Sequence, residues 1–395
     1  MKLESRERDS LGPAILSAGF RPFFLLAALW GAVGIPLWLL AYTAGFIIPG
    51  GVPALFWHAH EMVFGFAAAA AAGFLLTAVA NWTGRPAIRG APLVALAALW
   101  AAGRAAMMLS GPIGAPVTAI ADLSFLAALW VLLAREILSA GSWRNLPILC
   151  AVGALLAANL LFHLGELGVL SSPELGDRLG VAALLVMITL VGGRIIPAFT
   201  RNWLIKRNPA ASPPAAEGVF DHAAAVVTAA AVLALAFAPD QRITAWLLVV
   251  AGEASALRLA RWRGFAAFGE PLLFILHLGY AWLAAGLFLL GLDSITHFLP
   301  QADALHALTA GAIGIMILAV MTRVSLGHTG RPLAAGAGTC LAYGLVTLGA
   351  VLRVLSPAAG TETNLALAAA GTAWSAGFAL FLGIYGPMLI RPRVP

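Results

Sequence analysis

Apolar runs of about 20 residues, the length that crosses a bilayer as a helix, follow one another along the whole chain. Short stretches rich in Gly, Pro and charged residues separate these runs. Within a run, apolar and polar side chains do not alternate as they do in strands. The pattern predicts twelve membrane-spanning helices, at residues 22–44, 58–80, 91–109, 115–134, 145–165, 179–199, 220–238, 243–260, 271–292, 304–324, 333–353 and 364–389.

Composition favours a membrane protein and excludes a water-soluble one. Of the 395 residues, 61% are hydrophobic and only 10% are charged, and the mean hydropathy is +0.94. Inside a bilayer every backbone polar group must be hydrogen-bonded within the protein, so only helices or a closed barrel can span it. We predict an all-α polytopic membrane protein with one transmembrane domain at 22–390, an N-terminal tail at 1–21 and a C-terminal tail at 391–395.

Basic residues lie almost entirely on one side of the predicted helices. With the N-terminus inside, eighteen Lys and Arg residues fall in cytoplasmic segments, and only Arg178, Arg242 and Arg353 fall on the opposite side. This bias predicts that both termini are cytoplasmic. It also explains the sequence pI of about 10.0 without nucleic acid as a partner, because the basic residues are scattered among loops that border the membrane lipid.

The chain contains an internal repeat. When His60 is placed on His306, residues 83–86 and 329–332 align without a gap, and both read Thr-Gly-Arg-Pro. The same spacing puts Asp177 at the histidine position of the sixth predicted helix. The second, sixth and tenth helices are therefore predicted to be equivalent. The pseudo-threefold repeat that follows has three groups of four helices, at 22–135, 145–260 and 271–390.

Six histidines fall into two layers of this predicted topology. Four of them lie near the outer ends of their helices, and two lie towards the cytoplasmic side, near Arg194. The outer layer consists of His58, His60, His163 and His306, and the inner pair consists of His277 and His328.

The outer layer is a candidate haem and metal site. Imidazole suits iron, copper and zinc, and haem iron commonly takes an axial histidine. On a regular helix His58 and His60 point about 200° apart, so they should not bind the same ion. We predict His60 and its repeat partner His306 as ligands, with His58 beside a neighbouring cofactor. The alternative is that these histidines are hydrogen-bonded core residues or meet interfacial water.

Two charged residues could serve such a site. Glu61 is a candidate proton carrier, and with His58 a candidate catalytic residue, although a carboxylate is also favoured at a helix N-terminus without further role. Arg194 lies in the stretch 191–197, where glycines and a proline are predicted to break the helix. Its guanidinium should bind a carboxylate, a haem propionate or freed carbonyls, or else extend to the nearby membrane surface.

Several motifs, in order along the chain, resemble the NnrS family. The resemblance covers essentially the whole sequence, from Gly19 to the last predicted helix. The motifs are WHAHEMVFGF at 57–66, NWTG at 81–84, GGRIIPAFT at 192–200, HLGYAW at 277–282, HALT at 306–309 and GHTGR at 327–331.

This resemblance implies a bacterial inner-membrane protein that contains haem, expected to be of the b type, with copper as a second candidate metal. It also implies a link to denitrification and to defence against nitric oxide. The motif histidines correspond to the six histidines of the two layers. Twelve helices in three groups of four are similar in architecture to haem-copper oxidases, but the sixth helix here has no histidine, so the analogy does not transfer function.

Two functions from different classes follow. The first is a haem protein that binds nitric oxide and, as a nitric oxide reductase-like oxidoreductase, reduces it with electrons from quinol or a soluble donor. The second is a transporter of haem, metal or a nitrogen-oxide-related solute, in which buried histidines are transient binding sites. Few polar residues are available to make a hydrated path along the helices, which favours the first function.

Overall fold

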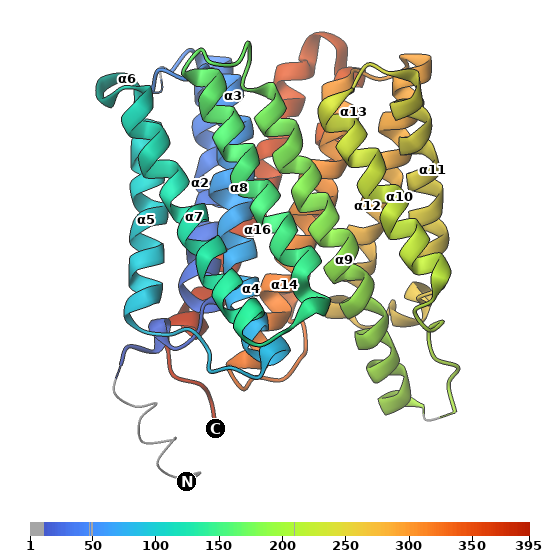
Figure 1. Ribbon diagram of the computed structural model, residues 1–395. Helices are drawn as coiled ribbons and strands as arrows, with labels where there is room; N and C mark the ends of the chain where they lie inside the picture. Colours follow the sequence, from blue (N-terminus) through green and yellow to red (C-terminus); the bar gives the residue numbers. More distant parts are fainter. Residues whose placement is uncertain (1–11, 47, 49, 209) are drawn as a thin grey trace.

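The computed structural model describes residues 12–46, 48, 50–208 and 210–395, and these residues contain helices and loops but no strand. The helices stand side by side as one bundle (Figure 1). The prediction of an all-α polytopic membrane protein is confirmed. Most of the predicted N-terminal tail, residues 1–11, lies outside the described residues, and the first long helix already begins at Phe20.

Within the described residues, eleven helical stretches are long and apolar enough to cross a membrane. The last of them, residues 337–390, folds back on itself at Gly360, whose φ of 55° interrupts the helix, so it supplies two crossings. The long helices are α2 (Phe20–Ala44), α4 (Ala68–Thr83), α5 (Ala91–Met108), α7 (Ala115–Ser139), α8 (Leu146–Glu166), α9 (Glu174–Arg207), α10 (Val219–Phe237), α11 (Arg242–Ala260), α12 (Pro271–Thr296), α14 (Gly314–His328), α15 (Ala337–Leu355) and α16 (Thr363–Ile390).

Two of these crossings are built from three consecutive pieces. The second consists of α3 (Ala54–His60), a π-helical turn η2 (Glu61–Ala67) and α4. The tenth consists of α13 (Gln301–His306), a π-helical turn η5 (Ala307–Ile313) and α14. Each π-helical turn begins directly after the histidine that the repeat aligns. This shared geometry supports the predicted equivalence of the two crossings, and such turns are frequent at functional sites.

The second, sixth and tenth crossings meet in the middle of the bundle. Helix α9 contacts both π-helical turns, and α14 contacts α4. The end of the bundle that carries α3, α13 and the short helix α6 (Ser110–Ile113) is called here the distal face, and the end at which the C-terminus lies is called the terminal face (Figure 1). The three central helices thus run from one face to the other side by side.

Helix α9 differs from its prediction in two ways. The glycines at 192 and 193 and Pro197 do not break it, and it continues through residues 200–207, which were expected to be a loop. Gly193 serves close packing instead, because a Cβ atom there would overlap the guanidinium of Arg258. Pro197 removes one backbone hydrogen bond, and the packed neighbours on both sides keep the helix continuous.

Arg21 joins the two ends of the described chain. It lies almost fully buried in the first turn of α2 and donates hydrogen bonds from Nη1 to the carbonyls of Leu389 and Arg391, at 2.8 and 2.7 Å. These carbonyls end α16, where a helix has unpaired acceptors and favours a cation. The count of basic residues by side included Arg21 among those of the cytoplasmic segments. In the structure it is buried and caps the C-terminal end of α16.

Candidate functional site

A cavity of about 330 Å³ lies towards the distal face, between the second, sixth and tenth crossings and the helices α2, α15 and α16. We call it the histidine-pair cavity because His58 and His306 line it from two different crossings. Its volume falls within the range of about 300–1,000 Å³ that is usual for ligand sites. The remaining wall is mainly apolar and includes Trp38, Phe66 and Trp374.

The two histidines of the cavity face each other as a parallel pair. Their ring centroids lie 6.4 Å apart and their planes differ by only 6°. His306 is held in place, because its Nδ1 donates a hydrogen bond of 2.5 Å to the carbonyl of Ala302. His58 is held by packing instead: its ring stacks on the indole of Trp38 at 4.4 Å, and its Nδ1 is buried without a hydrogen-bond partner among the described residues.

Besides the histidines, three ionisable residues line the cavity, namely Glu174 and Asp177 of α9 and Arg353 of α15. Arg353 lines the cavity and forms an ion pair with Asp303. The hydroxyl of Ser356 accepts a hydrogen bond from Arg353 and donates one to Asp303. Asp177 lines the cavity from α9, and its Oδ1 is buried without a partner in the described part of the chain. Asp177 occupies the position that the repeat assigns to the histidine of the sixth crossing. The cavity therefore collects the corresponding residues of the sixth and tenth crossings, Asp177 and His306, whereas the second crossing contributes His58, two residues before His60.

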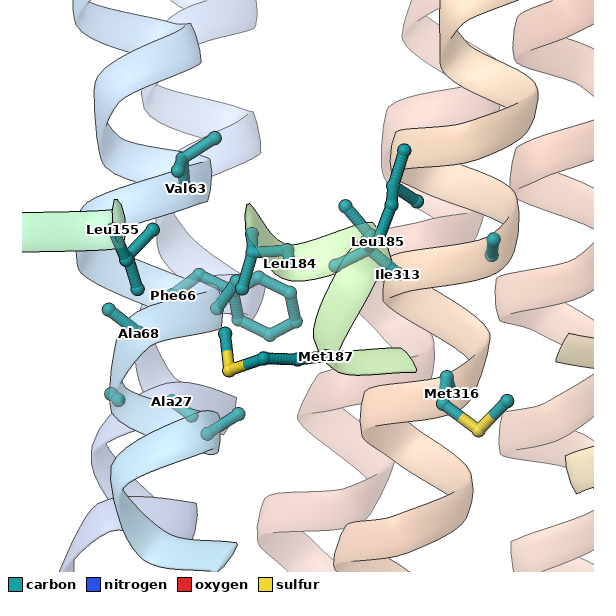
Figure 2. Close-up of a cluster of buried hydrophobic side chains, with 14 of the residues drawn as sticks. Ala27, Val63, Phe66, Ala68, Leu155, Leu184, Leu185, Met187, Ile313 and Met316 are labelled. Carbon is teal, nitrogen blue, oxygen red and sulfur yellow. The ribbon is translucent and has the colours of Figure 1, made fainter. Parts of the chain in front are cut away.

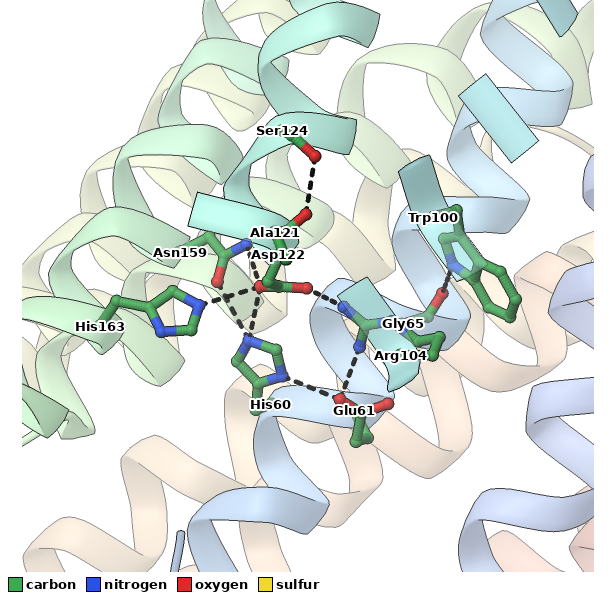
Figure 3. A network of polar contacts seen from close by, with 10 residues as sticks. All are labelled: His60, Glu61, Gly65, Trp100, Arg104, Ala121, Asp122, Ser124, Asn159 and His163. Atoms are coloured by element: carbon green, nitrogen blue, oxygen red, sulfur yellow. Dashed lines mark hydrogen bonds and ion pairs between the residues drawn. The ribbon is translucent and has the colours of Figure 1, made fainter. Parts of the chain in front are cut away.

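His60 points away from this cavity into a second group of residues, which we call the polar cluster (Figure 3). The cluster joins buried polar side chains of four crossings into one hydrogen-bonded unit. Its members are His60 and Glu61 of the second crossing, Arg104 of α5, Asp122 of α7, and Asn159 and His163 of α8.

One carboxylate oxygen is the centre of the polar cluster. Asp122 Oδ2 lies 3.1 Å from His60 Nε2 and 3.0 Å from His163 Nε2, and it accepts a hydrogen bond of 2.7 Å from the amide of Asn159. Its other oxygen is paired with Arg104, whose Nη1 also donates to Glu61 Oε1 at 2.5 Å. Every one of these side chains is at most 5% exposed. The cluster is thus shielded from solvent on all sides.

Both ring nitrogens of His60 face oxygen acceptors. Nδ1 lies 3.1 Å from Glu61 Oε1, and Nε2 lies 3.0 Å from Asn159 Oδ1 as well as 3.1 Å from Asp122 Oδ2. A lone pair pointed at these oxygens would be repelled, so a proton or a metal ion must lie between Nε2 and Asp122. Arg104 alone leaves the two carboxylates with one uncompensated negative charge, which a His60 protonated on both ring nitrogens, or a monovalent metal ion, would balance.

The same three residues have the spacing of a metal site. Ligand atoms of His60, Asp122 and His163 all lie within 4.8 Å of one another. Glu61 contacts the nitrogen of His60 that faces away from this centre, which is the arrangement that fixes the tautomer of a metal-binding histidine. The four histidines of the predicted outer layer are therefore divided into two sites, His58 with His306 and His60 with His163.

The predicted inner residues are not brought together in one contact. His277 is buried and its Nε2 contacts the hydroxyl of Thr200 at 2.9 Å. His328 ends α14, is exposed, and has its ring near Phe20. Arg194 donates to the side-chain oxygen of Asn145 and to the backbone carbonyl of Arg144, and neither is a carboxylate or a carbonyl freed by a break in its own helix.

Sequence reasoning missed three members of the polar cluster. Arg104 had no evident partner, and Asp122 and Asn159 were not singled out at all. A signal was present, because Arg104 and Asp122 are opposite charges within adjacent membrane helices, a placement that favours pairing. Glu61 is in the cluster and is not among the residues that line the histidine-pair cavity.

Twelve crossings with buried imidazoles in their centre define a polytopic α-helical membrane protein built around histidine sites. The chain belongs to the NnrS family, because the model of that family, described as NnrS protein, matches residues 14–393. As a member of this family it is a nitric-oxide-related membrane protein. Among the curated proteins, none matches the chain. The resemblance drawn from the sequence motifs is thus confirmed over almost the entire length.

Proposed function

We propose that the protein binds haem in the histidine-pair cavity and acts there on nitric oxide, by binding it and reducing it to detoxify it. The observation that carries this proposal is the parallel pair of His58 and His306 across a cavity of ligand size. Imidazole binds a metal through a nitrogen in the plane of its ring, at about 2 Å, so two imidazoles that pointed these nitrogens at one metal would have their ring centroids roughly 6 Å apart. The pair here has that separation.

The haem would supply an iron that binds nitric oxide and passes electrons to it. The haem is expected to be of the b type, because Cys150 and Cys340 lie far apart and offer no C-x-x-C-H attachment sequence. Electrons would come from quinol or from a soluble donor. The inner membrane of a bacterium, with both termini in the cytoplasm, is the location that the distribution of basic residues favours.

The two histidines would not act alike. His306 is oriented by its bond to Ala302, which leaves Nε2 as the nitrogen with a lone pair. The Nδ1 atom of His58 makes no hydrogen bond with the described residues, so its ring can turn without breaking one there. We assign His306 as the fixed ligand and His58 as the ligand that yields its place to the gas. Asp177, in the same cavity, is the group that would deliver protons.

The polar cluster would hold the second metal, for which copper is the candidate. His60 and His163 would bind it through Nε2 and Asp122 through Oδ2, while Glu61 keeps His60 in the required tautomer. The site lies on the opposite side of the second crossing from His58. Copper here would serve structure or electron storage rather than touch the gas.

Haem content of purified variants tests the proposal. The native protein is expected to show a Soret band, His306→Ala to lose most of it, and His58→Ala to keep haem with a changed band. His222→Ala is the matched control, because that histidine is 72% exposed and should leave the spectrum unchanged. A native protein without a Soret band, or two cavity variants with native spectra, would contradict the proposal. Metal-dependent uptake into liposomes without bound haem would favour transport instead.

A further inference from the structure

Two more cavities follow the histidine-pair cavity through the bundle towards the terminal face. The middle cavity, of about 90 Å³, is bordered by α4, α9, η5 and α14 and shares Leu184 and Ile313 with the histidine-pair cavity. The terminal cavity, of about 320 Å³, shares Phe74, Ile195 and Val320 with the middle cavity. Because neighbouring cavities have wall residues in common, the three form one file along the central helices.

Among the described residues, the wall of the middle cavity has no side chain that donates a hydrogen bond or carries a charge. Buried water needs two to four polar partners, so a cavity of this kind stays dry and accepts apolar guests such as xenon. Ions and protons cannot cross a dry apolar section, whereas a small uncharged molecule can. The lining residues are Phe24, Ala67, Ala70, Ala71, Phe74, Leu75, Leu184, Met187, Ile188, Val191, Gly192, Ile195, Ile313, Met316, Ile317, Val320 and Met321.

Small residues keep this section open. Ala67, Ala70 and Ala71 line it from the second crossing, and Gly192 lines it from α9. A Cβ atom at Gly192 would be in ordinary van der Waals contact with Tyr280, at 3.5 Å. Figure 2 shows the side chains of Phe66, Leu184 and Met187 between the helix of Val63 and the helix of Ile313. Methionine is unbranched and flexible, so Met187 can swing to let a small guest pass.

The terminal cavity differs in chemistry from the middle one. It includes Arg323, whose guanidinium lies 4.2 Å from the ring centroid of Phe199, and the exposed residues Gly327 and His328. It therefore reaches the surface of the terminal face, while the histidine-pair cavity lies towards the distal face. A molecule that enters the terminal cavity beside His328 must next cross the middle cavity. From Phe74 to Leu184 the wall of that cavity is apolar.

We infer that the file of three cavities is a passage for small uncharged molecules, which leads a diatomic gas from the terminal face to the histidine pair. The gas is taken as nitric oxide, and in this respect the inference rests on the proposed function. The dry middle section excludes ions and protons, so protons reach Asp177 by another route. The passage also accounts for alanine and glycine at central positions where larger apolar residues would pack more tightly.

Substitutions in the wall test the passage in the full-length protein. Ala71→Phe fills the middle cavity, and Met187→Ala widens it. Carbon monoxide rebinding after photolysis is the readout. Ala71→Phe should slow it about tenfold, the effect of about 1.4 kcal/mol of added barrier, and Met187→Ala should speed it, with both Soret bands unchanged. Ala230→Phe is the control, because Ala230 is exposed on the outside of α10. Native rates in both wall variants would overturn the passage.

Xenon binding gives a second readout that needs no haem. In crystals under xenon pressure, the native protein and Ala230→Phe should show xenon in the middle cavity, and Ala71→Phe should not. A middle cavity without xenon in the native protein would overturn the inference. Xenon in that cavity of a protein that lacks haem would support the passage while it contradicts the proposed haem function, so the two failures are distinguishable.

Discussion

Buried charges fix the side chains around His60. Arg104 is paired with both Glu61 and Asp122, and all three lie inside the bundle, away from water. Transfer of such groups from water is costly, so each of them depends on its partners. Because the ion pairs come from three different crossings, they also fix the positions of α5 and α7 against the second crossing.

Removal of Arg104 should destabilise the protein strongly. Arg104→Met leaves two buried carboxylates without their cation, and we expect a loss of about 3–5 kcal/mol of unfolding free energy. The midpoint of denaturant unfolding in detergent measures it. Arg135→Ala is the control, because Arg135 is 59% exposed and exposed ion pairs contribute about 0–1 kcal/mol. Equal midpoints for the two variants would show that the polar cluster does not stabilise the fold.

Glu61 should act on the polar cluster and leave the haem untouched. In Glu61→Gln the tautomer of His60 is held less firmly, so copper affinity should fall about 10–100-fold while haem content stays native. Copper titration of the apo-protein and the Soret band report the two sites separately. Glu174→Gln, at a carboxylate that is 56% exposed, should leave copper affinity unchanged. Loss of haem in Glu61→Gln would contradict the division into two sites.

Close contacts between neighbouring helices position the histidines. At Gly176 in α9, a Cβ atom would lie 2.6 Å from the carbonyl oxygen of Ala158 and 2.7 Å from Cα of Phe162, both in α8. His163 follows Phe162 directly and belongs to the polar cluster. The absence of a side chain at Gly176 therefore lets α8 approach closely enough for His163 to reach Asp122.

Gly176→Ala should separate α8 from α9. The new methyl group meets backbone rather than a flexible side chain, so we expect a loss of about 1–3 kcal/mol and weaker copper binding. Gly344→Ala in α15 is a matched control, because nothing lies within 4 Å of its added Cβ atom. An exposed helical glycine exchanged for alanine should gain about 0.5–1 kcal/mol. A neutral Gly176→Ala in thermal unfolding would contradict this account of the contact.

The sequence predicted crossings well and side-chain partners poorly, for a physical reason. Hydrophobic length alone identifies a membrane helix, and the spacing between His60 and His306 correctly identified equivalent positions. The direction of each histidine depended on which helices pack beside the second crossing, and spacing does not contain that information. Hence His60 was expected to share a site with His306, whereas His58 lies opposite His306 and His60 lies beside Asp122.

The orientation of the bundle in the membrane can be measured. The histidine-pair cavity lies towards the distal face and the terminal cavity reaches the terminal face, to which the basic residues of the predicted cytoplasmic loops belong. In a variant without Cys150 and Cys340, an impermeant maleimide should label Thr361→Cys in intact cells, because Thr361 is exposed in the turn between α15 and α16. Pro395→Cys should react only after lysis. The reverse pattern would place the histidine-pair cavity near the cytoplasm.

The central claim is that His58 and His306 hold a haem that nitric oxide can reach. Optical and electron paramagnetic resonance spectra of the purified native protein, recorded before and after nitric oxide is added to the reduced form, test it most directly. The account predicts a Soret band of histidine-ligated haem that shifts with the gas, and a resonance signal from the bound gas. A protein without a Soret band, or one whose band nitric oxide leaves unchanged, would contradict it.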